Sequence, residues 1–384
     1  MRPRRLKLSL NEFATLPASL RAAPNAVEAV TEVSVDLGLL YHHYYMDSYG
    51  VAPPSPDPAQ FEYLRFLVDS AEFVFLGEGL GRSSGGKRNR SMELGQAFCR
   101  WFLHEHLDVV YFAPIEDLLD GQPKAEFDGL ILARSAEGDT PDFLCRDSGR
   151  NVTVAEAKGS YAPSKFGSAK FREWRKQFDR ILVKAPSGAV QTLKGHIVET
   201  AWATESNGRA TSELLVEDPQ TPGDMPFSGE QTPALGRAIV ANHYSRIFSR
   251  LNVPLLSSAL RYRFVIPDEL RFGFIRWACL VPPFQGRTFL GGYYANSGST
   301  CQRAGRSADI DDPLDLARVS RTFVGIEEGV ASTAVAAARR GLSVFDRLEP
   351  AVHQPRLPSG LSYLRDGSVI GPVEFFRPLE VINL

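Results

Sequence analysis

The chain has 384 residues, more than one compact domain usually holds, so we expect two domains or one large domain with insertions. Its hydrophobic share of 43% and charged share of 23% are ordinary for a globular protein that buries a core. The formal net charge of −2 excludes a globally basic nucleic-acid-binding protein, so any such binding must come from a local patch.

The cysteines and the start of the chain bear on location. Cys99, Cys145, Cys279 and Cys301 are far apart and form no Cys-x-x-Cys pair, which argues against a zinc site and a disulfide framework. The basic start lacks the apolar segment of a secretory signal, and no apolar run of about 18 residues occurs. We therefore expect a cytoplasmic protein that is neither secreted nor embedded in a membrane.

Residues 1–70 are predicted to be mainly helical. An amphipathic stretch runs into His42 and His43, a Pro-rich break follows, and residues 58–71 have the pattern of a second helix. Adjacent histidines point apart on a helix or a strand, so packing is favoured over a shared metal ion.

Residues 71–204 begin with a strand, a Gly-rich loop, a helix and a strand, which is the order of an α/β fold. The loop at 79–92 contains four basic residues and no acidic one: Arg82, Lys87, Arg88 and Arg90. It can follow a phosphate backbone, or it can be a solvated loop. A nucleotide-binding loop is a third reading, but Arg88 stands where Ser or Thr would hold Mg²⁺.

The helix after this loop is predicted from Met92 to about His106, with Leu94, Phe98 and Phe102 toward the core. Glu93 lies in its first turn. There it can complement the helix dipole or join a metal site, and the sequence does not decide between the two.

A hairpin is predicted around residues 140–158. Two apolar runs, Phe143–Cys145 and Val152–Ala155, flank a polar turn that contains glycine. Side chains alternate along a strand, so Glu156 and Lys158 share a face, and a simple register brings Asp142 beside Glu156. Two carboxylates and an ammonium group are suited to holding Mg²⁺ and to hydrolysing a phosphodiester. The competing reading is a surface hairpin closed by a salt bridge, and Asp128 is a rival for the first carboxylate.

Pro141-Asp142 followed after thirteen residues by Glu156-Ala157-Lys158 resembles the signature of the PD-(D/E)XK nuclease superfamily. This resemblance implies a restriction-endonuclease-like core, an α/β fold with a mixed central sheet flanked by helices. It further implies that Asp142, Glu156 and the carbonyl of Ala157 bind the metal and that Lys158 orients the water. Glu93 matches an acidic residue that the family often places on the preceding helix. Gln177 matches a glutamine on the following helix.

The segment after the hairpin is predicted to be a loop and then a helix over 168–185. From Arg146 to Lys184 there are ten basic and four acidic residues, a net charge of +6, which favours a phosphate-rich substrate. The alternative is a solvated helix. The candidate nucleic-acid-binding residues here are Lys165, Lys170, Arg172, Arg175, Lys176 and Gln177.

The rest of the chain shows no catalytic pattern. Residues 205–233 are rich in Gly, Pro, Ser and Thr and are predicted to be a linker or an insertion. Residues 234–384 are predicted to form an α+β region for specificity, oligomerisation or partner binding. Its expected elements are a helix near 235–251, several strands, a small-residue helix over about 327–341 and a hairpin around Asp366-Gly367.

The sequence therefore predicts a nuclease dependent on Mg²⁺, for which Mn²⁺ can substitute. Double-stranded DNA is the expected substrate, with a protein partner or a second copy of the chain as a further possibility. The resemblance alone suggests a role in bacterial defence or repair. A non-catalytic nucleic-acid-binding or scaffold protein that keeps the fold is the alternative.

Overall fold

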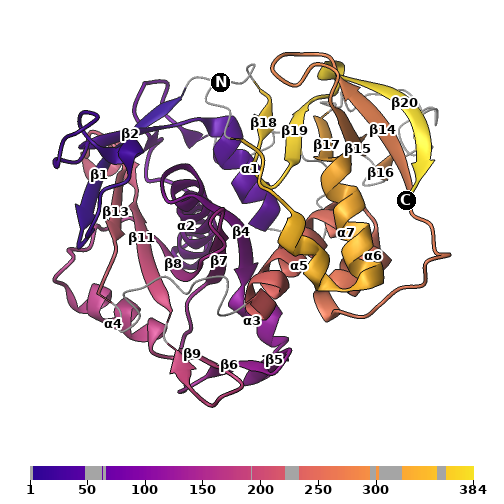
Figure 1. Ribbon diagram of the computed structural model, residues 1–384. Helices are drawn as coiled ribbons and strands as arrows, with labels where there is room; N and C mark the ends of the chain where they lie inside the picture. Colours follow the sequence, from indigo (N-terminus) through magenta and orange to yellow (C-terminus); the bar gives the residue numbers. More distant parts are fainter. Residues whose placement is uncertain are drawn as a thin grey trace. The chain divides into compact units, whose positions relative to one another are not determined.

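The computed structural model describes residues 3–47, 63, 66–191, 193–220, 233–294, 300–301, 322–352 and 360–384 (Figure 1). The chain forms two compact units. The N-terminal unit consists of Arg2–Tyr44 and Tyr63–Val240, and the C-terminal unit of Met1, Tyr45–Glu62 and Ala241–Leu384. Much of the segment predicted as a second helix at 58–71, and residues 221–232 of the predicted linker, lie outside the described residues.

The N-terminal unit is built on a seven-stranded mixed sheet. In spatial order its strands are β2 (Glu32–Val35), β1 (Arg4–Asn11), β13 (Glu213–Glu217), β11 (Lys194–Ala201), β8 (Val152–Ser160), β7 (Phe143–Asp147) and β4 (Val109–Pro114). The pairs β1–β13 and β8–β11 are parallel and the others are antiparallel. The predicted α/β fold with a mixed central sheet is confirmed.

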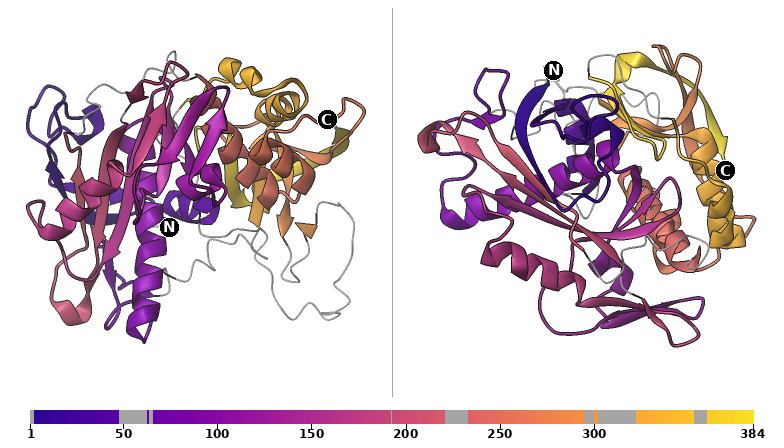
Figure 2. Two further views of the ribbon diagram at one scale, coloured as in Figure 1. Left: turned by 90° about the horizontal axis from the view of Figure 1, so that it is seen from below. Right: turned by 60° about the vertical axis from the view of Figure 1, so that its left-hand side comes forward.

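Helices α2 (Ser84–His106) and α4 (Ala169–Phe178) lie on opposite sides of this sheet (Figure 2). Glycines allow both close approaches. A Cβ on Gly159 of β8 would lie 1.8 Å from the backbone oxygen of Ser91 in α2, and a Cβ on Gly195 of β11 would lie 2.6 Å from the ring of Phe178 in α4. Because side chains alternate across a strand, Glu156 and Lys158 point away from α2, toward the side that α4 covers.

Smaller elements complete the N-terminal unit. A four-stranded sheet has the order β10 (Val190–Gln191), β9 (Ile181–Lys184), β6 (Leu130–Arg134) and β5 (Lys124–Phe127). Strands β3 (Val74–Phe75) and β12 (Ala203–Thr204) pair in parallel. The remaining elements are α1 (Leu37–Asp47), α3 (Ile115–Leu119), and the short 3₁₀ helices Ala18–Leu20 and Glu205–Asn207.

Two predicted helix boundaries are wrong. α2 begins at Ser84, not at Met92, because the Ser83 side chain caps it by accepting a hydrogen bond from the Gly86 backbone. Lys87, Arg88 and Arg90 therefore lie on a helix and not in a loop. The helix predicted over 168–185 ends at Phe178, and Ile181–Lys184 form β9 because β6 and β10 provide strand partners there.

Two regional predictions also need correction. The first 70 residues contain strands β1 and β2, so their description as mainly helical is wrong. The predicted linker contains β13, which lies inside the main sheet between β1 and β11. Strands β1 and β13 pair with each other across more than 150 residues, Lys7 with Glu213 for example, which a local pattern does not show.

The C-terminal unit contains an antiparallel sheet. Its strands are, in order, β18 (Ser362–Tyr363), β19 (Ser368–Pro372), β17 (Thr322–Glu327), β15 (Thr288–Tyr294), β14 (Gly273–Cys279) and β20 (Phe376–Asn383), with β16 (Thr300–Cys301) paired to β15. The helices are α5 (Pro233–Arg250), which begins in the N-terminal unit, α6 (Pro254–Tyr262) and α7 (Glu328–Arg340), with 3₁₀ turns at Leu342–Arg347 and Val373–Phe375. The predicted α+β character, the helices near 235–251 and 327–341, and the hairpin at Asp366-Gly367 are confirmed.

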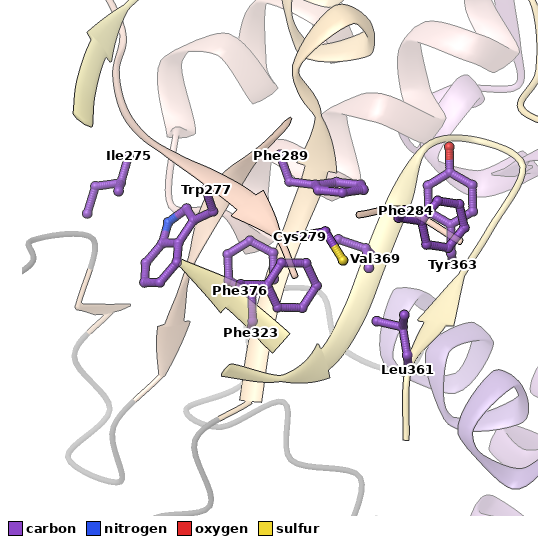
Figure 3. Packing of buried hydrophobic residues seen from close by; sticks show 10 residues of the cluster. All are labelled: Ile275, Trp277, Cys279, Phe284, Phe289, Phe323, Leu361, Tyr363, Val369 and Phe376. Carbon is purple, nitrogen blue, oxygen red and sulfur yellow. The ribbon is translucent and has the colours of Figure 1, made fainter. Parts of the chain in front are cut away.

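Aromatic side chains fill the interior of this second sheet (Figure 3). Phe323 stacks on Phe376 with ring centroids 4.1 Å apart, and Phe284 lies 4.4 Å from Tyr363. Trp277 closes the cluster, and its indole nitrogen donates to the Gly291 carbonyl. Such burial stabilises the unit without involving any charged group. No helix in the described parts of the chain is long and apolar enough to span a bilayer.

Candidate active site

The predicted hairpin forms with the predicted register. Phe143 of β7 pairs with Ala155 of β8, so the next pair outward is Asp142 opposite Glu156. Because β7 begins at Phe143, the backbone of β8 beyond Glu156 has no strand partner on this side. Asp142 therefore stands where the ladder ends, beside the free edge of β8.

The Asp142 carboxylate replaces the missing strand partner. Its Oδ2 accepts a hydrogen bond of 2.8 Å from the Ala157 backbone nitrogen. The N–H and C=O of one residue point to the same side of a strand, so the Ala157 carbonyl also faces the Asp142 side. Burial raises the pKa of Asp142, although the Lys158 charge and the Ala157 N–H act in the opposite direction.

Glu156 is completely buried, with 0% of its surface exposed. Oε1 forms an ion pair with the Lys158 ammonium, and the Asp142 carboxyl group is also within hydrogen-bond reach, a contact that needs a proton on one of the two carboxyl groups. Burial, and then the charge of Asp142, hold the pKa of Glu156 well above the usual range. Two buried carboxyl groups that share one ammonium are set up to bind something that supplies further positive charge.

The Lys158 side chain is 24% exposed and is the cation of the cluster. Burial lowers its pKa, but the charges of Glu156 and Asp142 more than compensate, so the pKa is raised overall. Lys158 is therefore an ammonium group at neutral pH. It can donate hydrogen bonds to a water or a phosphate oxygen but cannot act as a general base.

The donor set fits a hard divalent cation. The Asp142 and Glu156 carboxylates and the Ala157 carbonyl supply oxygen atoms alone, which is the preference of Mg²⁺. Mn²⁺ accepts the same ligands. Within the described residues, no group of three His, Cys, Asp or Glu side chains gathers closely enough to hold a metal ion.

Glu93 does not join the two carboxylates. It accepts a hydrogen bond of 2.8 Å from the Tyr63 hydroxyl. One turn further along α2, Gln96 reaches the site instead, with Nε2 3.4 Å from Asp142 Oδ1. Sequence reasoning missed Gln96, and only its spacing of three residues from Glu93 on the same helix could have suggested it.

Glu199 of β11 was also missed. It is completely buried and lies opposite Lys158 in the parallel pair of β11 and β8. Its carboxylate oxygens contact the end of β8 and the loop that follows β8. It accepts hydrogen bonds from the Ser160 and Ser164 hydroxyls at 2.8 and 3.0 Å. Burial raises its pKa, which these hydrogen bonds oppose. Ser160 ends β8 and Ser164 lies in the loop that follows it, so Glu199 fixes the start of that loop beside the site.

Several predicted nucleic-acid contacts have structural partners instead. Arg175 makes a bidentate ion pair with the fully buried Glu217 of β13, with N–O distances of 2.8 and 2.5 Å. Lys87 pairs with Glu78 at 3.0 Å, and Lys176 with Glu173 at 2.7 Å.

Gln177 is buried, and its Oε1 has no hydrogen-bond partner. The predicted contact of Gln177 with a nucleic-acid backbone therefore has no surface-exposed side chain to support it. Arg175 is likewise committed to the α4–β13 contact.

Other predicted basic residues do present their side chains to solvent: Arg82, Arg88, Lys165, Lys170 and Arg172. Arg90 is half-buried. Tyr161 ties the segments that carry them together, because its hydroxyl accepts a 2.6 Å hydrogen bond from the Leu80 backbone nitrogen. A Cβ on Gly79 would lie 2.4 Å from the same tyrosine ring, so a glycine is needed there. The basic segments before α2 and α4 are thus held next to each other, near the end of β8.

No observation favours a nucleotide-binding loop at Gly81–Lys87. The Lys87 ammonium is paired with Glu78 and lies 6.0 Å from the centre of the Tyr161 ring. Gly81 packs on the backbone of Gly86, where a Cβ would approach to 2.9 Å.

No protein-family model, no curated protein and no solved structure matches this chain.

Proposed function

We propose that the chain is a metal-dependent nuclease that hydrolyses phosphodiester bonds, with double-stranded DNA as the expected substrate. One observation carries the proposal. The fully buried Glu156 lies beside the Asp142 carboxyl group and a single ammonium group at the open end of β8. A buried salt bridge that served only stability would pair one carboxylate with one cation, whereas here two carboxyl groups share one ammonium.

In the proposed site Asp142, Glu156 and the Ala157 carbonyl hold the cation. A bound divalent ion supplies polarisation of the scissile phosphate and neutralises charge that develops on it. The Ala157 N–H donates to one oxygen of Asp142 and so orients the carboxylate, whose remaining lone pairs are available to the cation.

Lys158 has a separate role. Because its pKa is raised, it keeps its protons, donates to the attacking water and holds that water in line with the phosphorus. The same charge stabilises negative charge on the phosphate oxygens in the transition state.

The exposed basic residues bind the backbone away from the scissile bond. Arg82 and Arg88 at the start of α2, and Lys165 and Lys170 before and on α4, are the residues we assign to phosphate contacts. The negative overall charge requires that such contacts be local. We extend the proposal to a cytoplasmic enzyme of DNA defence or repair on the sequence resemblance.

The test compares the wild type with Lys158→Ala on plasmid, linear duplex, single-stranded DNA and RNA, each with Mg²⁺, Mn²⁺ or EDTA. We expect cleavage by the wild type that EDTA abolishes and that the variant reduces by about 10²–10³-fold. Lys184→Ala, which changes an exposed lysine on β9, is the matched control and should cut like the wild type.

Equal cleavage by the wild type and Lys158→Ala would contradict the proposal. A folded wild type that binds nucleic acid but never cuts it would support the non-catalytic alternative.

A further inference from the structure

We infer that this site holds one divalent cation, not two, and that Gln96 is the positioning residue that sets this limit. The inference rests on the proposed nuclease function for the identity of the site, but it concerns the number of ions and not the reaction. It follows from the charges around Glu156 and from the side chain that α2 delivers to Asp142.

Gln96 lies on α2. This helix packs directly on β8, since a Cβ on Gly95 would lie 2.8 Å from the Lys158 carbonyl carbon. The next residue, Gln96, is half-buried and turns its amide nitrogen to Asp142 Oδ1 at 3.4 Å. The side chain that α2 contributes next to Asp142 is therefore a neutral amide and not a carboxylate.

The Gln96 amide helps to orient the Asp142 carboxylate. With Ala157 N–H on Oδ2 and Gln96 on Oδ1, each oxygen of this carboxylate already accepts one hydrogen bond. Each oxygen can accept at two lone pairs, so one direction remains on each. The carboxylate is thus held in one orientation with limited capacity for further ligands, which is how a neighbouring donor tunes a metal ligand.

The charge balance of the site also favours one divalent ion over two. A carboxylate that binds a metal ion is deprotonated, so in the occupied site Asp142 and Glu156 contribute two negative charges, and Lys158 contributes one positive charge. One divalent ion changes the total from −1 to +1, whereas two would bring it to +3 around a carboxylate that is 0% exposed. Excess charge of one sign beside a buried group is unfavourable, and a second ion would need a further carboxylate to compensate it.

No other acidic side chain takes that place. Glu93 is engaged with Tyr63, and Glu199 directs both oxygens to Ser160 and Ser164. Asp139 is exposed and adds only a further attraction for Lys158. Within the described residues no third carboxylate joins the cluster.

The experiment counts ions directly. Full-length protein without nucleic acid is titrated with Mn²⁺, and free Mn²⁺ is measured by electron paramagnetic resonance. We expect one ion per chain, lost in Glu156→Gln. Gln96→Ala should weaken binding by about 10-fold because Asp142 loses its orienting partner. Gln96→Glu should bind a second ion or tighten the first by about 10-fold, because it adds the missing carboxylate.

Gln122→Glu is the matched control, since it adds a carboxylate in the exposed turn before β5 and should leave Mn²⁺ binding unchanged. The inference is overturned if the wild type binds two ions that both require Glu156, if it binds none, or if both Gln96 variants bind like the wild type. Circular dichroism of both Gln96 variants checks that they are folded.

A cleavage assay on the same preparations separates the two proposals. Cleavage with two bound ions would overturn the single-ion inference and leave the nuclease function standing. One bound ion without cleavage of any substrate would do the reverse.

Discussion

Each of the two seven-stranded sheets has a buried carboxylate beside a hairpin, Glu156 in one and Asp366 in the other, and the surroundings of these two groups differ. Asp366 is 1% exposed, and Oδ1 accepts from the Ser368 backbone nitrogen and hydroxyl at 2.7 and 2.5 Å. His243 Nε2 lies 2.8 Å from Oδ2. Among the described residues, Glu156 has only the Lys158 ammonium and the Asp142 carboxyl group beside it, and no backbone N–H donates to it. Equal burial thus has two meanings: Asp366 closes a turn, whereas Glu156 is prepared for a ligand.

The difference extends to the whole of each region. The C-terminal sheet fills its interior with aromatic rings, and its buried Asp366 is bonded by Ser368 of the same hairpin and by His243 and Tyr244 of α5. The first sheet places two carboxylates and a lysine at the end of a strand where the ladder stops. Satisfied burial stabilises a fold, and unsatisfied burial lowers stability in exchange for a binding site.

The largest expected effect is the loss of cleavage when the Glu156 charge is removed. Glu156→Gln keeps the side-chain shape but removes a proposed metal ligand, so metal-dependent cleavage should fall by about 10³-fold or more. Initial rates on plasmid with Mg²⁺ measure this. Glu173→Gln, an exposed carboxylate on α4, should keep the wild-type rate, and a similar loss there would mean that the effect is not specific to the site.

The second carboxylate should behave in the opposite way in a stability measurement. Asp366→Asn weakens the charged hydrogen bonds to Ser368 and His243, so the free energy of unfolding should fall by about 3 kcal/mol. Urea unfolding monitored by tryptophan fluorescence tests it. Glu156→Gln should change the free energy of unfolding by less than about 1 kcal/mol in the same experiment, because the loss of the Lys158 ion pair is offset by no longer burying a charge. Equal losses in the two variants would remove the distinction drawn here.

Neighbouring basic residues on α4 give a similar contrast inside the first unit. Arg175→Ala leaves the fully buried Glu217 without its cation and should cost about 3 kcal/mol of unfolding free energy. Lys176→Ala breaks only an exposed pair with Glu173 and should cost less than about 0.5 kcal/mol. Urea midpoints of the two variants compare them, and an equally mild Arg175→Ala would show that α4 is held to β13 by other contacts.

The pH dependence of stability should expose the ligand-binding character of Glu156. Its native pKa lies well above 4.5, so the native state holds this proton more tightly than the unfolded chain does. Metal-free stability is therefore lost as pH rises from about 4.5 through the native pKa. Gln at position 156 cannot ionise, so the stability of Glu156→Gln relative to the wild type should rise between pH 4.5 and 8 in EDTA.

Mg²⁺ should reduce this difference in stability between Glu156→Gln and the wild type at pH 8, because it binds the ionised Glu156 of the wild type. Unfolding curves at pH 4.5 and 8, with and without Mg²⁺, test both statements. A wild type that tracks the variant at every pH would mean that Glu156 titrates like an ordinary carboxylate.

The smallest expected effect concerns the exposed basic residues. Arg88→Ala and Lys165→Ala should each weaken DNA binding uniformly across sequences and reduce the slope of log affinity against log salt by about 1. Fluorescence anisotropy with catalysis blocked by EDTA measures the slope. Lys124→Ala, which removes an exposed charge on β5, is the control, and an unchanged slope in the first two variants would place the DNA elsewhere.

Local pattern was sufficient for the hairpin at the centre of the site. The apolar runs, the glycine turn and strand alternation predicted that Asp142 and Glu156 face each other, because a two-strand hairpin depends on residues close in sequence. The helix over 327–341 and the turn at Asp366-Gly367 were predictable for the same reason.

Only the tertiary structure decided the remaining features. Strand β13 forms inside a segment with a linker composition because β1 and β11 supply its hydrogen bonds. Arg175 belongs to the fold and not to a nucleic-acid surface because Glu217, 42 residues later, is brought to it. Gln96, and not Glu93, reaches Asp142 because packing of α2 on β8 selects which face of the helix enters the site. In each case the deciding partner is distant in sequence, and residue type and spacing alone do not indicate which side chains the sheet brings together.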